Sequence, residues 1–166
     1  MAVDVMKALL HAVDDVRALG IRKHIVVEID CPADLPRTRG KSLQLERLLC
    51  TLLTHAIKVS AKGAVVQAFA VATLHGARGM CDSVAVVVAD RGTLMRRRGF
   101  DRLLSAFRPS SVLQMHGVLS GTPILSLTCR LGQLDGGRVW VKSKAGHGSI
   151  LAAVLPVVRR HRSASA

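Results

Sequence analysis

Three polar side chains at helical spacing form the first group in this sequence that could do chemistry. Thr51, His55 and Lys58 recur about one turn apart, opposite a face of leucines, because residues three and four positions apart lie on the same side of a helix. A hydroxyl, an imidazole and an ammonium group in one row could hold a polar, anionic ligand such as a nucleotide. The alternative is a solvated helix face that tolerates one histidine.

A carboxylate and a basic segment form the second group. Asp90 and Gly92 follow a run of valines and alanines that is typical of a buried strand, and Arg96, Arg97 and Arg98 come soon after. A nucleotide site needs a carboxylate for the purine and donors for the phosphates, and arginines can hold phosphates by charge. An aspartate after a strand is also ordinary turn chemistry, and adjacent arginines are also ordinary in a solvated loop.

The four cysteines do not form a metal motif. Cys31, Cys50, Cys81 and Cys129 include no CxxC pair, and no Cys–His ladder has the spacing of a zinc site. They lie in or beside apolar stretches, where free cysteine behaves as a small hydrophobic residue. We interpret them as reduced core residues of a cytoplasmic protein and expect no metal site.

The elements that position these groups follow from the apolar periodicity. Residues that recur every three or four positions predict helices, and short β-rich runs between turn residues predict strands. Gly20 is expected to end the first helix, and Ser42 to cap the second. The predicted order is helix 3–19, strand 24–30, a helix from 42 that ends by Gly63, strands 64–75 and 82–89 around a turn at 76–79, a connection over 90–120, helix 124–134, and strands 138–143 and 149–157.

This order predicts a two-layer α/β sandwich, in which helices pack on one face of a mixed sheet. The 166 residues suit one domain with an aliphatic core, because 49% are hydrophobic while only three Phe, one Trp and no Tyr occur. We expect residues 1–158 to form this domain and residues 159–166 to be a basic flexible tail. No run of about 18 uncharged apolar residues occurs, so we expect no membrane contact.

The net charge favours an anionic partner. The chain has 24 Lys and Arg against 11 Asp and Glu, a formal charge of +13. Such a surplus suits a nucleotide, a nucleic acid, an acidic protein face or anionic lipid. The alternative is a compositional bias that scatters arginine over the surface without a specific partner.

Four segments carry motifs that occur together in one family. Residues 44–60 (QLERLLCTLLTHAIKVS) look like an N-box helix, residues 82–92 like the strand into a D-x-G-x-G box, and residues 100–107 like an F-box. The most specific segment is 136–149 (GGRVWVKSKAGHGS), followed by Leu155 and Pro156. In this order and spacing, from about residue 3 to 157, they resemble the histidine-kinase branch of the GHKL ATPases, which have the Bergerat fold.

The resemblance implies a fold, a ligand and a set of site residues. The fold is the two-layer sandwich already predicted, and the ligand is ATP or ADP. Asp90 would accept from the adenine amino group, and Ser149 would lie beside the base. The full set of nucleotide-binding positions is Thr51, His55, Lys58, Asp90, Gly92 and Ser149.

Two N-box positions depart from the family pattern. The second N-box asparagine, which holds Mg²⁺ in the family, is His55 here, and the first N-box position is Thr51. Mg²⁺ prefers oxygen ligands in near-octahedral geometry, so imidazole is a poor substitute. Mg²⁺ binding is therefore doubtful in this chain.

The lid and the phosphoacceptor also depart. Leu94 replaces the second glycine of D-x-G-x-G, and Ser120, Thr122 and Ile124 replace lid glycines, whose backbone would approach phosphate closely. His11 lacks the acidic neighbour of a phosphoacceptor histidine, and we interpret it as a helix-surface residue. These departures predict weakened or lost catalysis.

Three functions remain open. The first is the ATP-binding domain of a two-component sensor histidine kinase, which would serve a histidine on a helical hairpin elsewhere. The second is a non-catalytic pseudo-ATPase module that docks such a hairpin or a response-regulator receiver, whose acidic residues would complement the +13 charge. The third is nucleic-acid binding, which ranks last because the 2% aromatic content leaves little for base stacking.

Overall fold

A five-stranded sheet forms the centre of the computed structural model, which describes residues 2–74, 81–90, 137–144 and 148–158. The strand order is β2–β4–β5–β7–β6. β2 and β4 are parallel and the other neighbouring strands are antiparallel, so the prediction of a mixed sheet is confirmed. The strands are β2 (Val26–Asp30), β4 (Val65–Leu74), β5 (Cys81–Asp90), β6 (Arg138–Lys144) and β7 (Gly148–Pro156).

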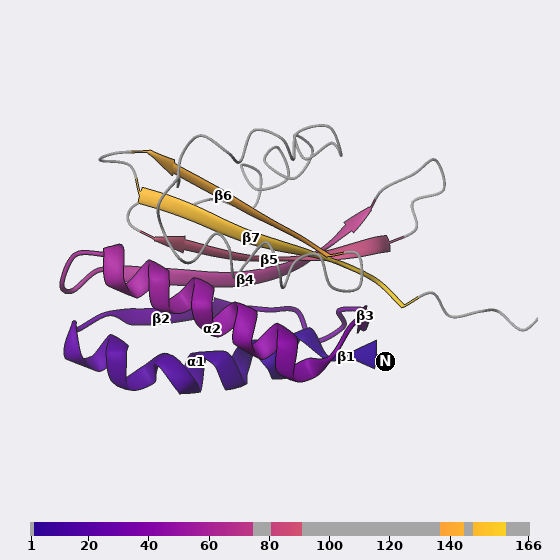
Figure 1. Cartoon of the computed structure of the whole chain (residues 1–166), viewed down its shortest axis with the longest axis horizontal. Helices are drawn as coiled ribbons and strands as arrows, with labels where there is room; N and C mark the ends of the chain where they lie inside the picture. The colour runs from indigo at the N-terminus through magenta and orange to yellow at the C-terminus, as the bar shows by residue number, and fades with distance from the viewer. Residues whose placement is uncertain (1, 75–80, 91–136, 145–147, 159–166) are drawn as a thin grey trace, which may run out of the picture.

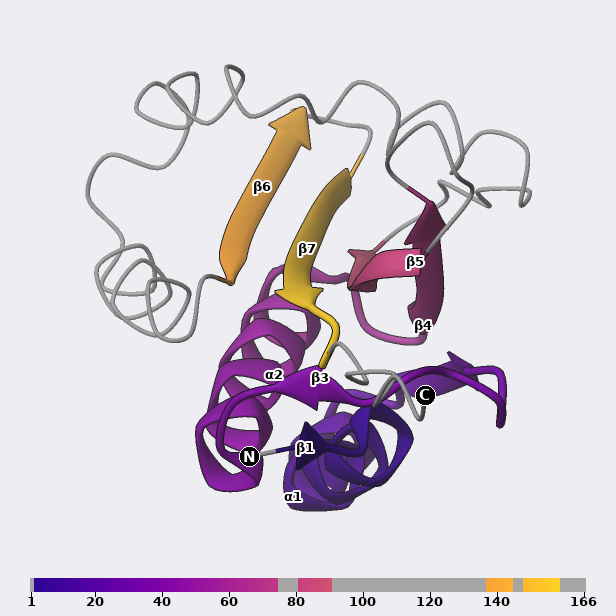
Figure 2. The same cartoon turned by 90° about the vertical axis from the view of Figure 1, so that its right-hand side faces the viewer.

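Two helices form the second layer. α1 (Val5–Arg22) and α2 (Ser42–Val59) lie side by side on one face of the sheet (Figure 1, Figure 2). α1 packs against β2 and α2 against β5. The predicted two-layer α/β sandwich is therefore confirmed. Within the described residues, neither helix has a stretch both long and apolar enough to span a bilayer.

The core between the layers is aliphatic, as the composition predicts. Leu9, Leu49 and Leu52 are fully buried where the helices meet the sheet. Alternate residues of β5, such as Val84 and Val86, complete this core because successive strand residues point to opposite faces. Each buried leucine contributes about 1.5–3 kcal/mol relative to an exposed one.

The opposite face of the sheet is also apolar and buried. Ala85, Val87, Ala89, Ile150 and Ala152 form a second cluster there. These residues alternate with the members of the first core along β5 and β7. Burial on both faces explains why β5 has a continuous apolar run rather than alternating polar and apolar residues.

A small second sheet lies at the other end of the molecule from the α2 C-terminus. β1 (Ala2–Val3) pairs antiparallel with β3 (Thr38–Arg39), and Thr38 also bridges to Val157 after β7. This arrangement brings together three segments that are distant in sequence (Figure 1). The sequence analysis predicts neither strand, because two residues are too few to show a period.

The prediction that Gly20 ends the first helix is wrong. α1 continues to Arg22 and ends in a Schellman motif, in which the N–H of Ile25 donates to the Gly20 carbonyl at 2.9 Å and the N–H of His24 to the Ile21 carbonyl at 3.1 Å. His24 supplies the left-handed residue, with φ 54°. A Cβ on Gly20 would lie 3.2 Å from the Ile25 carbonyl oxygen, so the glycine marks a close approach.

The predicted caps are partly wrong as well. The N-cap of α2 is Lys41, whose side chain makes no capping hydrogen bond, and Ser42 is already helical. Asp4 caps α1 by accepting from the backbone N–H of Lys7 at 3.1 Å, so this helix begins at Val5 rather than at residue 3. Cap geometry decides helix ends to within one or two residues.

Candidate functional site

The predicted polar row lies on α2, on the side away from the buried leucines. The Thr51 hydroxyl donates to the Arg47 carbonyl oxygen of its own helix at 2.9 Å, so its hydrogen is already in use while its oxygen can still accept. The His55 side chain is half-buried and the Lys58 side chain is exposed. Lys58 is therefore the member of the row best able to meet an anionic group from solvent.

Asp90 and Ser149 occupy neighbouring strand positions. Asp90 is the last residue of β5, and the preceding residue, Ala89, pairs with Ile150 on β7. The next position of this antiparallel register on β7 is Ser149, which itself pairs with Ser143 on β6. The sheet thus brings two predicted site residues from distant parts of the sequence to the same end of adjacent strands.

The C-terminus of α2 reaches this same end of the sheet. Asp90 pairs with Val66 at the start of β4, and β4 begins soon after α2 ends at Val59. In Figure 1 the end of α2, the end of β5 and the start of β7 lie together at the left. Lys58, Asp90 and Ser149 therefore share one end of the molecule, and Thr51 lies about two turns further back along α2.

Several predicted features lie outside the described residues. Gly92 is one, together with the arginines of the same segment and Leu94. The others are the turn at 76–79, the F-box-like segment 100–107, the lid positions Ser120, Thr122 and Ile124, the predicted helix 124–134, and the tail 159–166.

A lysine that the sequence analysis missed holds the C-terminus of α2. Lys23 Nζ donates to the carbonyl oxygens of Ile57 at 2.8 Å, Lys58 at 2.9 Å and Ser60 at 2.7 Å. A cation at a helix C-terminus also interacts favourably with the helix dipole. No local pattern reveals this contact, because the acceptors lie 34 to 37 positions away in the sequence.

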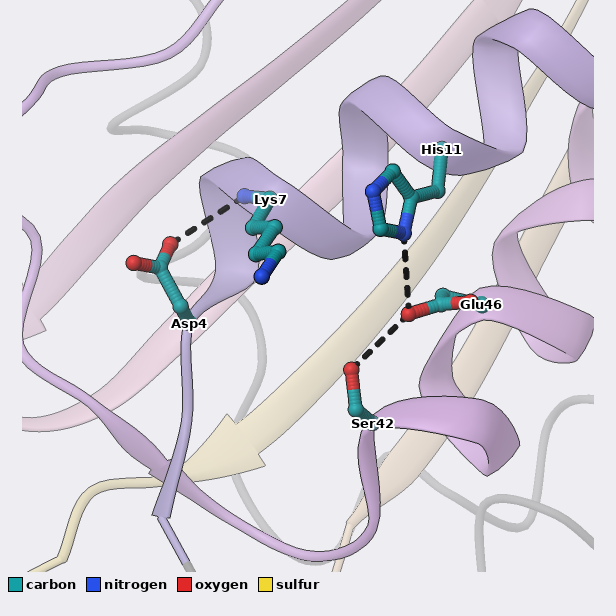
Figure 3. Close-up of polar contacts among 5 residues, drawn as sticks. All are labelled: Asp4, Lys7, His11, Ser42 and Glu46. Atoms are coloured by element: carbon teal, nitrogen blue, oxygen red, sulfur yellow. Dashed lines mark hydrogen bonds and ion pairs between the residues drawn. The ribbon is translucent and has the colours of Figure 1, made fainter.

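A second polar cluster joins the two helices near the start of α2 (Figure 3). Glu46 Oε1 accepts from the Ser42 hydroxyl at 2.8 Å and lies 3.3 Å from His11 Nδ1. The Ser42 hydrogen bond is the largest cause that lowers the pKa of Glu46; the His11 contact and the charge of Lys7 act in the same direction against a desolvation effect. The His11 side chain is 50% exposed, which confirms it as a helix-surface residue.

The α2 row offers poor ligands for Mg²⁺. The described residues contain no group of three or more His, Cys, Asp or Glu side chains that could hold a metal ion. The α2 row offers an imidazole, an ammonium group and the single Thr51 hydroxyl, whereas Mg²⁺ demands near-octahedral oxygen ligands. Lys58 places a solvent-exposed cation at the end of the sheet where the positions of Asp90 and Ser149 also lie.

The two cysteines whose side chains are described are free thiols. Cys31 and Cys50 are partly buried and unpaired by disulfide, and both pack against the core, as predicted. Burial raises the pKa of Cys31, and the nearby charges of Asp4 and Asp30 raise it further. The thiol therefore stays protonated and unreactive at neutral pH.

The fold made by these elements is that of histidine kinase catalytic domains. The mycobacterial sensor histidine kinase MprB superposes with a TM-score of 0.66 at 18% identity, over 96% of this chain and 99% of that chain. The catalytic domain of histidine kinase ThkA gives 0.66 at 12% identity, over 96% and 98%. At such identities the likeness establishes the fold alone.

Two solved complexes match as well. Full-length ShkA in complex with AMPPNP has a TM-score of 0.65 at 20% identity, over 96% of this chain and 32% of that chain. ThkA in complex with the response regulator protein TrrA has a TM-score of 0.65 at 10% identity, over 95% and 42%.

The sequence itself is similar to sensor kinases. The adaptive-response sensory kinase SasA of Synechococcus elongatus is 31% identical over 131 residues, which cover 78% of this chain and 32% of SasA. The alginate biosynthesis sensor protein KinB of Pseudomonas aeruginosa is 27% identical over 139 residues, which cover 83% and 21%. The chain thus spans less than a third of these relatives. No protein-family model matches the sequence.

Proposed function

We propose that this chain is the ATP-binding domain of a two-component sensor histidine kinase, with weakened or lost catalysis. The observation that supports the proposal is that Lys58 near the end of α2, Asp90 at the end of β5 and Ser149 at the start of β7 lie at the same end of a fold of this type. Residues 1–158 make up the domain in this proposal, and residues 159–166 are a basic tail. The domain works in the cytoplasm, where ATP is available.

Each site residue has a distinct part in holding ATP or ADP. Asp90 accepts from the purine amino group and Ser149 lies beside the base, while Gly92 completes the D-x-G pattern that begins at Asp90. Lys58 offers charge to the phosphates, with the Thr51 oxygen and His55 behind it on the same helix face. The AMPPNP complex of ShkA, which has the same fold, supports a nucleotide as the ligand class.

Weakened catalysis follows from the chemistry of the α2 row. Phosphoryl transfer depends on positioning and on stabilising the phosphate charge, usually with a metal ion. The row contains no carboxylate or amide oxygen, and the hydrogen of its one hydroxyl, on Thr51, is bound to the Arg47 carbonyl. Nucleotide binding without efficient turnover is the consequence.

The chemistry of the α2 row also favours a second candidate function, a pseudo-ATPase interaction module. Such a module would keep the fold and dock the phosphoacceptor hairpin of a kinase or a receiver domain. The complex of ThkA with the response regulator TrrA supports a receiver as the kind of partner. The formal charge of +13 would favour association with an acidic protein surface.

Calorimetric titration of the purified chain with ATP and with ADP tests the proposal. We expect a Kd on the order of micromolar, equal with Mg²⁺ and with EDTA because the α2 row does not fit the metal. Asp90→Ala should weaken binding at least about tenfold, since it removes a charge-assisted hydrogen bond to the base. Asp15→Ala is the matched control, because it removes an equal charge from an exposed position on α1.

Each outcome separates the two candidate functions. Binding that Asp90→Ala abolishes and Asp15→Ala preserves supports the nucleotide site. A strict Mg²⁺ requirement would contradict the weakened metal site. No binding in any buffer would rule out the ATP-binding function and leave the interaction module, which co-purification with a kinase hairpin or a receiver domain would then test.

A further inference from the structure

All three hydrogen-bond donors of the Lys23 ammonium group are engaged, and the proposed function assigns these contacts no part. An ammonium group has three N–H donors and no acceptor, and all three donors of Lys23 meet carbonyl oxygens at 2.7–2.9 Å. The side chain is half-buried at the point where the ends of α1 and α2 meet. A surface lysine that merely adds charge would not converge on three backbone oxygens of another element.

The acceptors are the carbonyls that a helix cannot satisfy by itself. The last four carbonyls of an α-helix have no partner within the helix. In α2, the Ala56 carbonyl accepts from Ser60 through both its backbone N–H, at 3.1 Å, and its hydroxyl, at 2.6 Å. The carbonyls of Ile57 and Lys58 accept from Lys23. The final turn of α2 thus depends on a side chain that follows the other helix.

The backbone of Lys23 holds the connection that leads from α2 into the sheet. Its carbonyl accepts from the N–H of Gly63 at 3.0 Å, where a φ of +80° favours glycine. One residue later, the Ala64 carbonyl accepts from the N–H of Val26 at 3.4 Å, and Val26 pairs with Val65 in the sheet. β4 then begins, and its Val66 pairs with Asp90.

From these contacts we infer that Lys23 is a positioning residue for nucleotide binding. It fixes the last turn of α2, which carries Lys58, relative to the start of β4, which pairs with Asp90. The inference rests on the proposed function, since it concerns the same site. Without the ammonium group, the freed carbonyls would accept hydrogen bonds from water instead, and the last turn of α2 would fray. Binding would then have to order Lys58 again, which lowers affinity.

The test is the ATP affinity of Lys23→Met, which keeps most of the side-chain length and removes all three donors. Calorimetry is run at low temperature, where circular dichroism shows each variant to be folded. We expect the Kd to rise about three- to tenfold, the cost of ordering one or two side chains. Hydrogen exchange of the amides in residues 57–64 should become faster, and Lys23→Arg should restore part of both properties.

Two controls separate positioning from charge and from general stability. Lys62→Met removes an equal charge from an exposed residue in the same connection and should leave the Kd unchanged. Val16→Ala truncates a buried residue of α1, so it lowers the melting temperature but should leave the Kd and the exchange at 57–64 unchanged.

The outcomes distinguish this inference from the proposed function. A weaker Kd and faster local exchange in Lys23→Met, absent from both controls, would support it. ATP binding that Lys23→Met leaves intact would overturn the inference alone and make Lys23 a general stabiliser. Absence of ATP binding by the unchanged chain would overturn the proposed function and this inference together.

Discussion

One buried hydroxyl group has no hydrogen-bond partner in the described residues. Thr38 is fully buried between β1 and the end of β7, and its Oγ1 is unsatisfied. Leaving such a group unpaired costs about 1–3 kcal/mol. We expect Thr38→Val, which keeps the shape and removes the hydroxyl, to raise the free energy of unfolding by about 1 kcal/mol in urea denaturation.

The complementary substitution at the same position is the control for that prediction. Thr38→Ser keeps the hydroxyl and removes a buried methyl group, so the free energy of unfolding should fall by about 1 kcal/mol. A Thr38→Val variant less stable than the unchanged chain would mean that the hydroxyl has a partner, such as an internal water.

The lowered pKa of Glu46 makes the stability of the fold depend on pH. Its folded-state pKa is lowered, chiefly by the Ser42 hydroxyl, so the unfolded chain binds a proton more readily at this position. Glu46 therefore stabilises the fold above its unfolded pKa, and this contribution is lost as the pH falls through the lowered folded pKa. Melting temperatures of Glu46→Gln and the unchanged chain should differ near neutral pH and converge in acid.

The Ser42 hydroxyl provides an internal check on this pH dependence. In a Ser42→Ala background the main cause of the lowered pKa is absent, so Glu46→Gln should change the melting temperature less. A difference between Glu46→Gln and the unchanged chain that persists undiminished in acid would contradict the assignment to Glu46.

Residue-level prediction succeeds where the signal is local. The row of Thr51, His55 and Lys58 was predictable because helical periodicity alone puts these positions on one face. Two other contacts were not predictable: that of Lys23 with the end of α2, and that of His11 with Glu46. Each joins two segments whose relative placement no local sequence pattern encodes. The hydrogen bond of Thr51 to Arg47 was also missed, although a helical threonine commonly bonds back to the carbonyl four residues earlier.

Among the elements, the end of α1 offers a direct test. The Schellman motif puts His24 at φ 54°, a left-handed conformation that costs an L-residue free energy and costs glycine very little. His24→Gly should therefore raise the free energy of unfolding by up to about 1 kcal/mol. Chemical denaturation measures this change, and His24→Val, a β-branched residue that resists positive φ, should lower it.

The outcome of the His24 series would also bear on Lys23. Because Lys23 directly precedes His24, a motif that glycine relaxes should still present the ammonium group to α2. If His24→Gly instead lowers stability, the side chain of His24 makes a contact that outweighs its backbone strain.

Element prediction was accurate for long, strongly patterned segments and poor for their ends. The strands at 64–75 and 82–89 appear as Val65–Leu74 and Cys81–Asp90, because the runs of β-branched residues are long. The predicted end of the first helix at Gly20 was wrong, since a glycine can signal either helix termination or close packing. Only the segment that packs against the glycine distinguishes the two. β1 and β3 have two residues each, which is below the length at which a period exists.

At the scale of the whole molecule, the sandwich was predictable and the site was predictable only in part. The order of elements and the family motifs were sufficient for the two-layer fold. The pairing that brings Asp90 next to the Ser149 position depends on the register between β5 and β7, which no local pattern contains. The burial of β5 on both faces likewise depends on what covers each face.

The contacts around Thr38 also determine how the molecule would carry mechanical load. A pull applied to residues 2 and 158 would pass from β1 through β3 to the bridge at Val157 and the bond from the Val158 N–H to the Arg37 carbonyl. This short path bears the load before the long ladders of the main sheet do, so its few hydrogen bonds would break first. Tension would detach β1 and β3 while the far end of the sheet, with Asp90 beside the end of α2, kept its shape.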